Sequence, residues 1–328
     1  MADTDVGRVA GAVRRHVGVA VGVVDGDWVE VAGFGVDGPA GGAPDGATSF
    51  QIGSVTKVFT ALLLADAVAR GEVELAQPLT SVFPEAVSHV SGPIRLVDLA
   101  THTSGLPRLP PGLWRQALRN REDPYAAFTV EQVERALALP PKHQPGGRLR
   151  YSNYGAGVLG EALARLTNLP YEQLVRDRIV EPLGLQDTRV EPDGREVSIA
   201  VGHTRRGRPV GDWHLPALAG AGALRSSVRD LLLLLRAHLD PTSTPLEAAV
   251  RAVVEPRARI SRPLSVGLGW HILERKDAVR WWWHNGGTGG FRSFVGFDPA
   301  ATRGVVVLSN DTRSVDRLGQ RLLEPPST

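Results

Sequence analysis

Residues 53–71 read GSVTKVFTALLLADAVARG, in which a Gly-Ser pair is followed by a long run of helix-forming residues. From Thr56 onward, apolar side chains occur on nearly every face of the predicted helix. A surface helix would be apolar along one stripe only. Gly71 stands at the position where helices commonly end. The stretch therefore predicts a buried helix that places Ser54 at its amino end.

Segments with a strand pattern lie on both sides of this helix. Two β-rich runs in residues 17–35 flank the hairpin signal Asp25-Gly26-Asp27, and a helical segment at 5–16 precedes them. From about Ser265 the chain again shows short β runs, broken by Gly or Asp-Pro, before a last helix at about 315–323. The segments between have helical period: EQVERALAL, YGAGVLGEALARLT, YEQLVRDRIV and SVRDLLLLLRAHL.

Strands at both ends and helices between them predict the fold class. We expect an α/β (α+β) protein whose antiparallel sheet is built from both chain ends, flanked by helices, with a mostly α-helical insertion. Residues 1–328 would form a single module without internal repeats. Within it, 1–60 and 255–328 would form the sheet subdomain, and 61–254 the mostly helical subdomain.

Composition narrows the function classes. The chain has 328 residues, of which 42% are hydrophobic and 22% charged, with a net charge of +2 and no cysteine. The sequence has no stripe of Lys and Arg interleaved with aromatics, so nucleic-acid binding is not expected. No run reaches the ~18 apolar residues needed to span a bilayer. The first residues lack a signal-peptide pattern, so the chain as written is expected in the cytoplasm.

Ser54 and Lys57 form the first candidate site. Residues at i and i+3 lie on the same face of a helix, about 5–6 Å apart, so the Lys57 amine can reach the Ser54 hydroxyl. A serine needs an adjacent base to become a nucleophile, and a lysine can serve when burial lowers its pKa. A buried lysine without a role is costly. A chance Ser-x-x-Lys pair is the alternative.

Two further motifs follow along the chain. Tyr151-Ser152-Asn153 precedes a predicted helix; the tyrosine hydroxyl can relay a proton and the asparagine amide can bind a substrate amide. The alternative has Asn153 as a helix N-cap and Tyr151 as a packing residue. The residues 284–290, HNGGTGG, lie between two predicted strands, where glycines let a substrate approach the backbone closely. A long turn is the alternative there.

The order and spacing of the three motifs resemble the serine β-lactamase and penicillin-binding protein superfamily. The similarity is to the branch of class C β-lactamases, family VIII-type carboxylesterases and D-Ala-D-Ala carboxypeptidases, and it runs nearly the full length. Its segments are LATHTSGLP (99–107), RYSNYGAGVLGEAL (150–163), AGALRSSVRDLLLLL (221–235) and HNGGTGGFRSFVGFDP (284–299).

This resemblance implies a role for each matching residue. Ser54 would be acylated, Lys57 would take its proton, and Tyr151 would pass a proton to the leaving group. Asn153 would hold Lys57 and the acyl amide, and His284 would stand where the family has Lys or His. The substrate and oxyanion residues would be Asn153, His284, Asn285, Gly286 and Gly287, with the oxyanion held by the N–H groups of Ser54 and Gly287.

Asn285 departs from the family pattern. It replaces a threonine that helps bind a substrate carboxylate, so recognition of a β-lactam or a terminal carboxylate is in question. Arg280 or Arg292 could supply a cation, although a solvated arginine is the alternative for each.

Other conspicuous residues have structural interpretations. We expect His102 to be structural. Trp281 and Trp283 share one strand face, which is either core or the wall of an apolar pocket. The histidines show no metal-ligand spacing, so no metal and no cofactor are expected.

The motifs together predict a serine hydrolase that forms an acyl-Ser54 intermediate with an ester or small amide. The rival is a D-aminoacyl peptidase, D-Ala-D-Ala carboxypeptidase or β-lactamase, which Asn285 and the absent signal-peptide pattern disfavour. An acyltransferase would use the same acyl-enzyme. A non-catalytic binding homologue would have lost Lys57 or Tyr151, and both are present. The expected partner is a small-molecule acyl substrate, not a nucleic acid or a membrane; the sequence indicates no oligomeric state.

Overall fold

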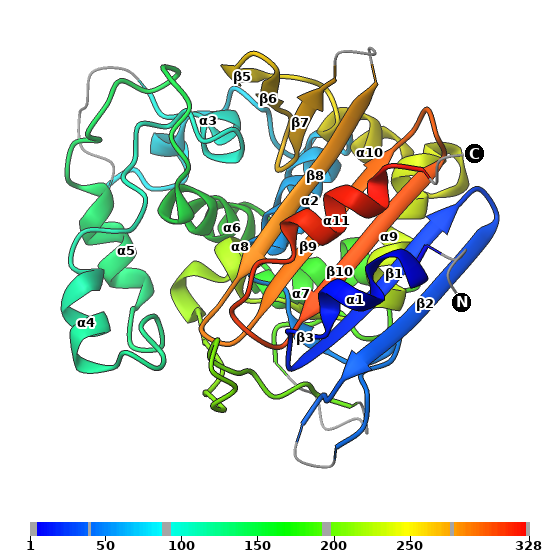
Figure 1. Ribbon diagram of the computed structural model, residues 1–328. Coiled ribbons are helices and arrows are strands. Elements are labelled where there is room, and N and C mark those ends of the chain that lie inside the picture. The colour runs from blue at the N-terminus through cyan, green and yellow to red at the C-terminus, as the bar shows by residue number, and fades with distance from the viewer. Residues whose placement is uncertain (1–4, 39–40, 87–92, 192–197, 276–278, 326–328) are drawn as a thin grey trace.

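An eight-stranded antiparallel sheet forms the core of the protein in a computed structural model, which describes residues 5–38, 41–86, 93–191, 198–275 and 279–325. Its strand order is β2-β1-β10-β9-β8-β7-β6-β5 (Figure 1). A separate two-stranded sheet pairs β3 with β4. The strands are β1 (Gly18–Asp25), β2 (Trp28–Gly35), β3 (Phe50–Gln51), β4 (Arg225–Ser226), β5 (Ala258–Ser261), β6 (Leu264–Val266), β7 (His271–Glu274), β8 (Arg280–Gly287), β9 (Arg292–Asp298) and β10 (Arg303–Ser309).

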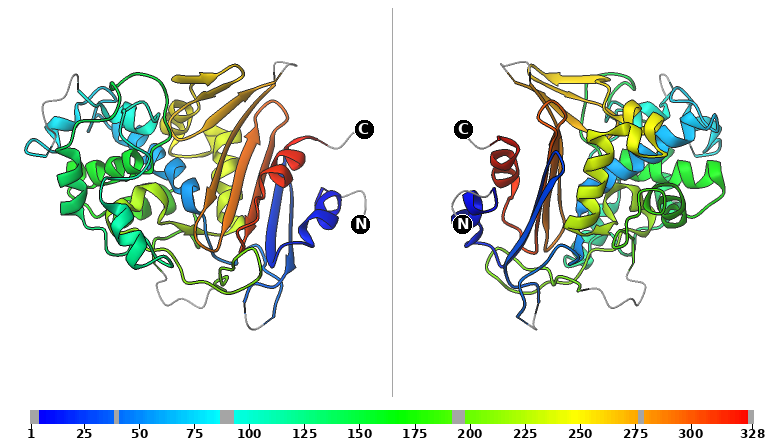
Figure 2. Two further views of the ribbon diagram at one scale, coloured as in Figure 1. Left: turned by 60° about the vertical axis from the view of Figure 1, so that its left-hand side comes forward. Right: turned by 90° about the vertical axis from the view of Figure 1, so that its right-hand side faces the viewer.

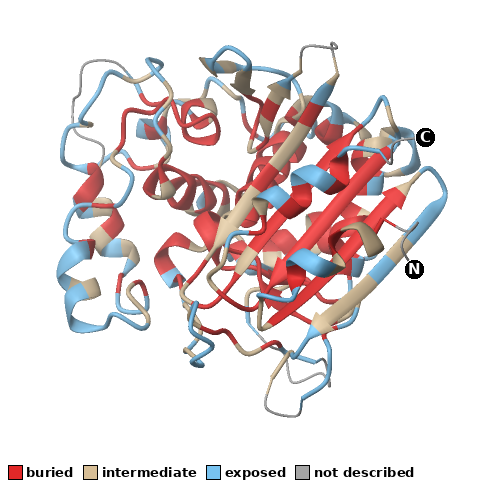
Figure 3. Ribbon diagram, in the orientation of Figure 1, coloured by how far each residue is buried: buried red, intermediate tan, exposed pale blue. Residues whose placement is uncertain are grey.

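Both chain ends contribute to the centre of the sheet, as the sequence pattern predicts. Strand β1 pairs with β10 from Val19 opposite Ser309 to Asp25 opposite Arg303, and on its other side it pairs with β2. The central strands β1, β9 and β10 are almost wholly buried, whereas β2 at the edge is exposed or half-buried (Figure 3). The α/β fold with an antiparallel sheet is therefore confirmed.

Helices cover both faces of the sheet (Figure 2). Helices α1 and α11 lie on one face and α9 packs across β1, β9 and β10 on the other. The helices are α1 (Ala10–Val13), α2 (Thr56–Ala69), α3 (Leu96–Ala100), α4 (Leu113–Arg119), α5 (Val130–Leu137), α6 (Asn153–Thr167), α7 (Tyr171–Val175), α8 (Ala219–Gly222), α9 (Val228–Leu239), α10 (Glu247–Val253) and α11 (Asp316–Leu323). A π-helical turn, Arg176–Val180, follows α7, and 3-10 turns occupy Gly7–Val9, Gly53–Val55, Leu79–Ser81, Pro216–Leu218 and Pro241–Ser243.

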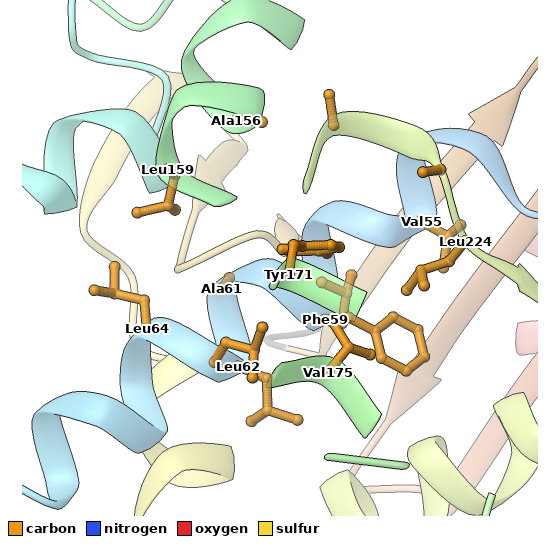
Figure 4. Close-up of a cluster of buried hydrophobic side chains, with 14 of the residues drawn as sticks. Val55, Phe59, Ala61, Leu62, Leu64, Ala156, Leu159, Tyr171, Val175 and Leu224 are labelled. Atoms are coloured by element: carbon orange, nitrogen blue, oxygen red, sulfur yellow. The ribbon is translucent and has the colours of Figure 1, made fainter. Parts of the chain in front are cut away.

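Helix α2 is the buried helix that its sequence predicts. Its residues from Thr56 through Ala67 are all buried. Side chains from α6 and α7 pack in the same apolar cluster: Figure 4 shows Phe59 of α2 beside Val175 of α7, and Leu159 of α6 belongs to this cluster. Full burial of one such leucine or phenylalanine contributes roughly 2 kcal/mol. The apolar contacts around α2 thus hold its amino end in a fixed position.

Some boundaries differ from the predicted ones. The helical segment expected at 5–16 is limited to a 3-10 turn and α1, which together cover 7–13, and the late strands begin with β5, before Ser265. The residues between β6 and β7 form a connection, although VGLGWHIL reads as one β run. The subdomain boundaries at 60 and 254 stay a prediction; the first falls inside α2 and the second directly after α10.

The tryptophan run on β8 belongs to the core. Trp281 is buried in the apolar cluster between the sheet and α11, where Trp283 packs against it from a half-buried position. The ring of Trp283 stacks on Phe294 at 6.1 Å between centroids. Of the two interpretations that the sequence leaves open for this face, the structure shows core. No helix in the described ranges has the length and apolar character that crossing a membrane requires.

Candidate functional site

Ser54 lies in the 3-10 turn Gly53–Val55, which leads directly into α2. Gly53 has φ +51°, the left-handed region that favours glycine. A Cβ built on Gly53 would lie 2.6 Å from the amide nitrogen of Gly287, so the turn and strand β8 are in close contact. This turn half-exposes Ser54 at the mouth of the site while its neighbours Gly53 and Val55 stay buried.

Lys57 lies one helical turn from Ser54 and is 3% exposed. Its amine donates hydrogen bonds to Ser54 Oγ at 3.1 Å and to the carbonyl of Ala221 at 2.6 Å. Burial, the largest cause, lowers the pKa of Lys57 below its ordinary 10.5; the adjacent Tyr151 raises it, and the Arg108 guanidinium lowers it further. A lysine with a lowered pKa has a larger neutral fraction, whose lone pair can accept the Ser54 proton.

Tyr151 lies beside Lys57, with the amine 5.1 Å from the centre of its ring. It precedes α6, whose N-cap is Ser152: the Ser152 hydroxyl accepts a hydrogen bond from the amide of Gly155 at 2.8 Å. The alternative interpretation, with Asn153 as the N-cap, is therefore wrong. The structure brings Ser54, Lys57 and Tyr151 together, as the motifs predict.

Asn153 opens α6 and lines the same cavity as Ser54. Burial raises the pKa of Tyr125, and a hydrogen bond with the Asn153 side chain opposes this rise. The side-chain oxygen of Asn153 is buried and has no hydrogen-bond partner among the described residues. The Lys57 amine donates hydrogen bonds to Ser54 and Ala221. Among the described residues, the hydrogen bond between Asn153 and Lys57 that the resemblance implies is not formed. The resemblance assigns the Asn153 oxygen a substrate N–H, which would be the partner that it lacks.

Strand β8 brings a free backbone edge to Ser54. It pairs with β9 along residues 282–287 but with β7 only as far as Trp283. The amide of Thr288 donates to the carbonyl of Phe291, and bonded and unbonded pairs alternate in an antiparallel ladder. The amide of Gly287 therefore points away from β9. Together with the Ser54 amide, it fits the two-donor oxyanion site that the resemblance implied.

Gly286 is the position at which this strand touches the nucleophile turn. A Cβ there would lie 2.0 Å from the carbonyl oxygen of Ile52 and 3.0 Å from the amide nitrogen of Ser54. Because backbone atoms are in the way, no side-chain rotation relieves the clash. We expect Gly286→Ala to displace β8 from the turn and lower the acylation rate by at least ~10²-fold, the scale for loss of an oxyanion donor.

The rate of labelling by a fluorophosphonate measures this effect, with circular dichroism to confirm folding. Gly11→Ala is the matched control, because a Cβ at Gly11 meets nothing within 4 Å. Equal labelling rates for the Gly286 variant and the Gly11 control would show that contact between β8 and the turn is irrelevant to acylation.

His284 lies behind the site. It is 1% exposed, is not among the residues that line the cavity, and pairs through Nδ1 with the carbonyl of Asn285 at 2.7 Å. Burial, followed by His271 and Lys57, holds the pKa of His284 well below 6.5, so the ring is uncharged at neutral pH. It cannot supply the positive charge that a lysine at this place would. In the described ranges, no group of three or more His, Cys, Asp or Glu side chains could hold a metal ion.

A cavity of about 530 Å³ opens beside Ser54. Arginine, aromatic and acidic side chains contribute to its wall together with the predicted residues. Its lining residues are Ser54, Arg108, Leu109, Tyr125, Tyr151, Asn153, Trp213, Asn285, Gly286, Gly287, Thr288, Arg292, Ser314 and Asp316. Six of these were missed by the sequence analysis: Arg108, Leu109, Tyr125, Trp213, Ser314 and Asp316. Arg108 alone had a usable signal, since it directly follows LATHTSGLP.

The two candidate cations of the sequence differ in position. Arg280 pairs with Glu274 at 3.2 Å at the far end of β8. Arg292 lines the cavity, but its Nη1 donates to the carbonyls of Thr288 and Phe291. Of these two arginines, Arg292 is therefore the one that borders the cavity.

Asn285 turns its side chain toward an acid. Its Nδ2 donates to Asp316 Oδ1 at 3.1 Å, at the start of α11. Both residues line the cavity. The Asn285 amide, which stands in place of the family's threonine, therefore already donates a hydrogen bond to the Asp316 carboxylate.

Known proteins resemble this chain along most of its length. The family model described as "Beta-lactamase" matches residues 7–324. A "Beta-lactamase" of Escherichia coli (strain K12) is 28% identical over 297 residues, which cover 80% of this chain and 75% of that protein. The "D-alanyl-D-alanine-carboxypeptidase/endopeptidase AmpH" of the same strain is 26% identical over 319 residues, covering 89% and 78%.

A solved structure has the same fold. The "Beta-Lactamase/D-Alanine Carboxypeptidase from Pseudomonas syringae" superposes with a TM-score of 0.85 and covers 99% of this chain and 98% of its own, at 23% identity.

Proposed function

The chain belongs to the beta-lactamase family, and we propose that this serine hydrolase acts on an ester or small amide through an acyl-Ser54 intermediate. One observation carries the proposal: the buried Lys57 amine lies 3.1 Å from the Ser54 hydroxyl. A serine with a base at this distance has what nucleophilic catalysis requires.

Acylation begins when the neutral Lys57 amine accepts the Ser54 hydroxyl proton. The bond between Ser54 Oγ and the carbonyl carbon forms, and the charge that develops on the carbonyl oxygen faces the amides of Ser54 and Gly287. The bond from the carbonyl carbon to the leaving oxygen or nitrogen then breaks. The leaving group receives a proton through Tyr151, which lies beside the protonated Lys57.

Deacylation repeats the sequence with water as the nucleophile. Water attacks the acyl carbon and gives its proton to the same pair, Lys57 and Tyr151. The bond to Ser54 Oγ breaks, the serine regains its proton, and the acid leaves. An alcohol or amine that replaced water at this step would make the protein an acyltransferase.

The pairing of Asn285 with Asp316 supports an ester or small amide without a carboxylate beside the scissile bond. The Asp316 carboxylate repels a second negative charge nearby, and the Asn285 donor is already engaged. Arg292 and the names of the relatives favour the second candidate, a D-Ala-D-Ala carboxypeptidase or β-lactamase.

Intact-protein mass spectrometry with two probes separates these candidates. We expect a fluorophosphonate to add one covalent group and benzylpenicillin to add none, with measurable turnover of a p-nitrophenyl ester. If benzylpenicillin labels the protein stably or is hydrolysed rapidly, the second candidate function is correct and the esterase proposal is wrong. If neither probe labels the protein and no ester is turned over, the catalytic proposal is wrong.

A further inference from the structure

Residues 101–108, called here the 101–108 loop, contact the residues on both sides of Tyr151. The hydroxyl of Ser152 donates to the carbonyl of Pro107 at 2.7 Å, and the amide of Asn153 donates to the carbonyl of Arg108 at 2.9 Å. The loop thereby fixes the chain on the carboxyl side of Tyr151.

His102 contacts the chain on both sides of Tyr151 and the ring between them. Its carbonyl accepts the amide of Arg150 at 2.8 Å, and its Nδ1 accepts the amide of Ser152 at 3.3 Å. Its imidazole packs on the Tyr151 ring, with 4.5 Å between the ring centroids. One buried side chain thus determines both the backbone and the ring of the proton-relay residue.

The backbone of His102 is unusual. Its φ is +59°, in the left-handed region that residues other than glycine seldom adopt. Such conformations persist where the surroundings over-determine them, often at functional sites. Here the left-handed turn allows the carbonyl and the ring of one residue to reach the two neighbours of Tyr151.

The imidazole supplies contact without charge. Because Nδ1 accepts the Ser152 amide, the proton is on Nε2. Burial, then Lys57 and His271, holds the pKa of His102 well below 6.5. The Tyr151 ring also faces two basic side chains, with Lys57 Nζ at 5.1 Å and Arg108 Cζ at 5.3 Å from its centre. An uncharged histidine holds the ring without adding a positive charge beside them.

We propose that His102 is a positioning residue that holds the Tyr151 ring in place for proton transfer at Ser54. This inference rests on the proposed function, because it assigns His102 an effect on acylation through Tyr151. It also goes beyond the structural role that the sequence suggests for His102.

A double-mutant cycle tests whether the effect passes through Tyr151. His102→Gly removes the ring and Nδ1 but tolerates the left-handed backbone and keeps the carbonyl. In the wild-type background it should lower the rate of ethyl ester hydrolysis ~10-fold or more, as a misplaced catalytic group does, because the ethoxide leaving group needs the proton that Tyr151 delivers. In the Tyr151→Phe background it should lower the rate less than ~2-fold, because residues that act through one another are not additive.

Thr103→Val is the matched control within the same loop. Thr103 is buried and bonds to Thr101 and Asp98, not to Tyr151. Its substitution should lower the melting temperature while the rate of ethyl ester hydrolysis by the folded protein stays within ~2-fold of wild type. If His102→Gly lowers the rate by the same factor in both backgrounds, or no more than Thr103→Val does, the positioning role is wrong.

The positioning role of His102 can still be tested if His102→Gly is defective in folding. If His102→Gly does not fold, His102→Asn replaces it in the cycle, since asparagine also tolerates the left-handed region and lacks the ring. The same two outcomes then apply. Failure of the proposed function looks different, because the wild-type protein would then take no fluorophosphonate label at all.

Discussion

Ser54→Ala is expected to abolish covalent labelling by a fluorophosphonate and to lower p-nitrophenyl ester hydrolysis by at least ~10³-fold. The substitution removes the only atom that forms the acyl bond, while the cavity, the oxyanion amides and Lys57 stay in place. Residual turnover would come from binding and the oxyanion site alone. Intact-protein mass and initial rates measure the two effects.

Ser81→Ala is the control for this result, because Ser81 is an exposed serine outside the cavity. It should label and turn over ester like the wild type. A Ser54→Ala protein that still gains the mass of the probe would place the nucleophile elsewhere.

Lys57→Met has the second largest expected effect. Methionine fills the buried space of the lysine chain but cannot accept a proton, so acylation should fall by at least ~10²-fold, the scale for loss of a general base. In the wild type, the acylation rate should rise with pH as Lys57 loses its proton. Because the pKa of Lys57 lies below 10.5, this rise should also lie below pH 10.5. The variant should lack the rise.

Lys57→Met should lower the acylation rate but should not lower the stability of the folded protein. The unfolded chain keeps Lys57 protonated in water at its ordinary pKa, whereas the folded protein must bury the charge or release the proton. The lysine therefore costs stability throughout the pH range below 10.5, and Lys57→Met should melt at the same or a higher temperature at pH 7.

If Lys57→Met acylates at the wild-type rate, Lys57 is not the general base. A melting temperature well below wild type would show that Lys57 is structural.

Local rules account for what the sequence predicts correctly. The Ser54–Lys57 contact follows from helix spacing alone, and the burial of α2 follows from its all-round apolar pattern. The antiparallel sheet follows from strand patterns at both ends of the chain. These features depend on residues that lie close together in sequence, or on which face of an element is apolar.

The remaining parts of the site depend on tertiary packing. Arg108 reaches Tyr151 because the 101–108 loop packs against the start of α6, and Asp316 reaches Asn285 because α11 begins beside β8. A single arginine or aspartate has no periodicity or spacing that predicts such a neighbour. The N-cap of α6 could have been read as either Ser152 or Asn153, because both are good N-cap residues.

The pairing of β1 with β10 has a consequence for how the protein comes to be folded. These strands lie nearly the whole chain apart, and β1 forms only the hairpin with β2 until residues 303–309 have been synthesised. A newly made chain therefore carries a valine-rich strand edge that waits for its partner through most of translation. Contacts of such long range make folding slow and expose the intermediate to aggregation. Expression yield should accordingly be limited by the wait for β10, because the sheet is complete only when that strand pairs with β1.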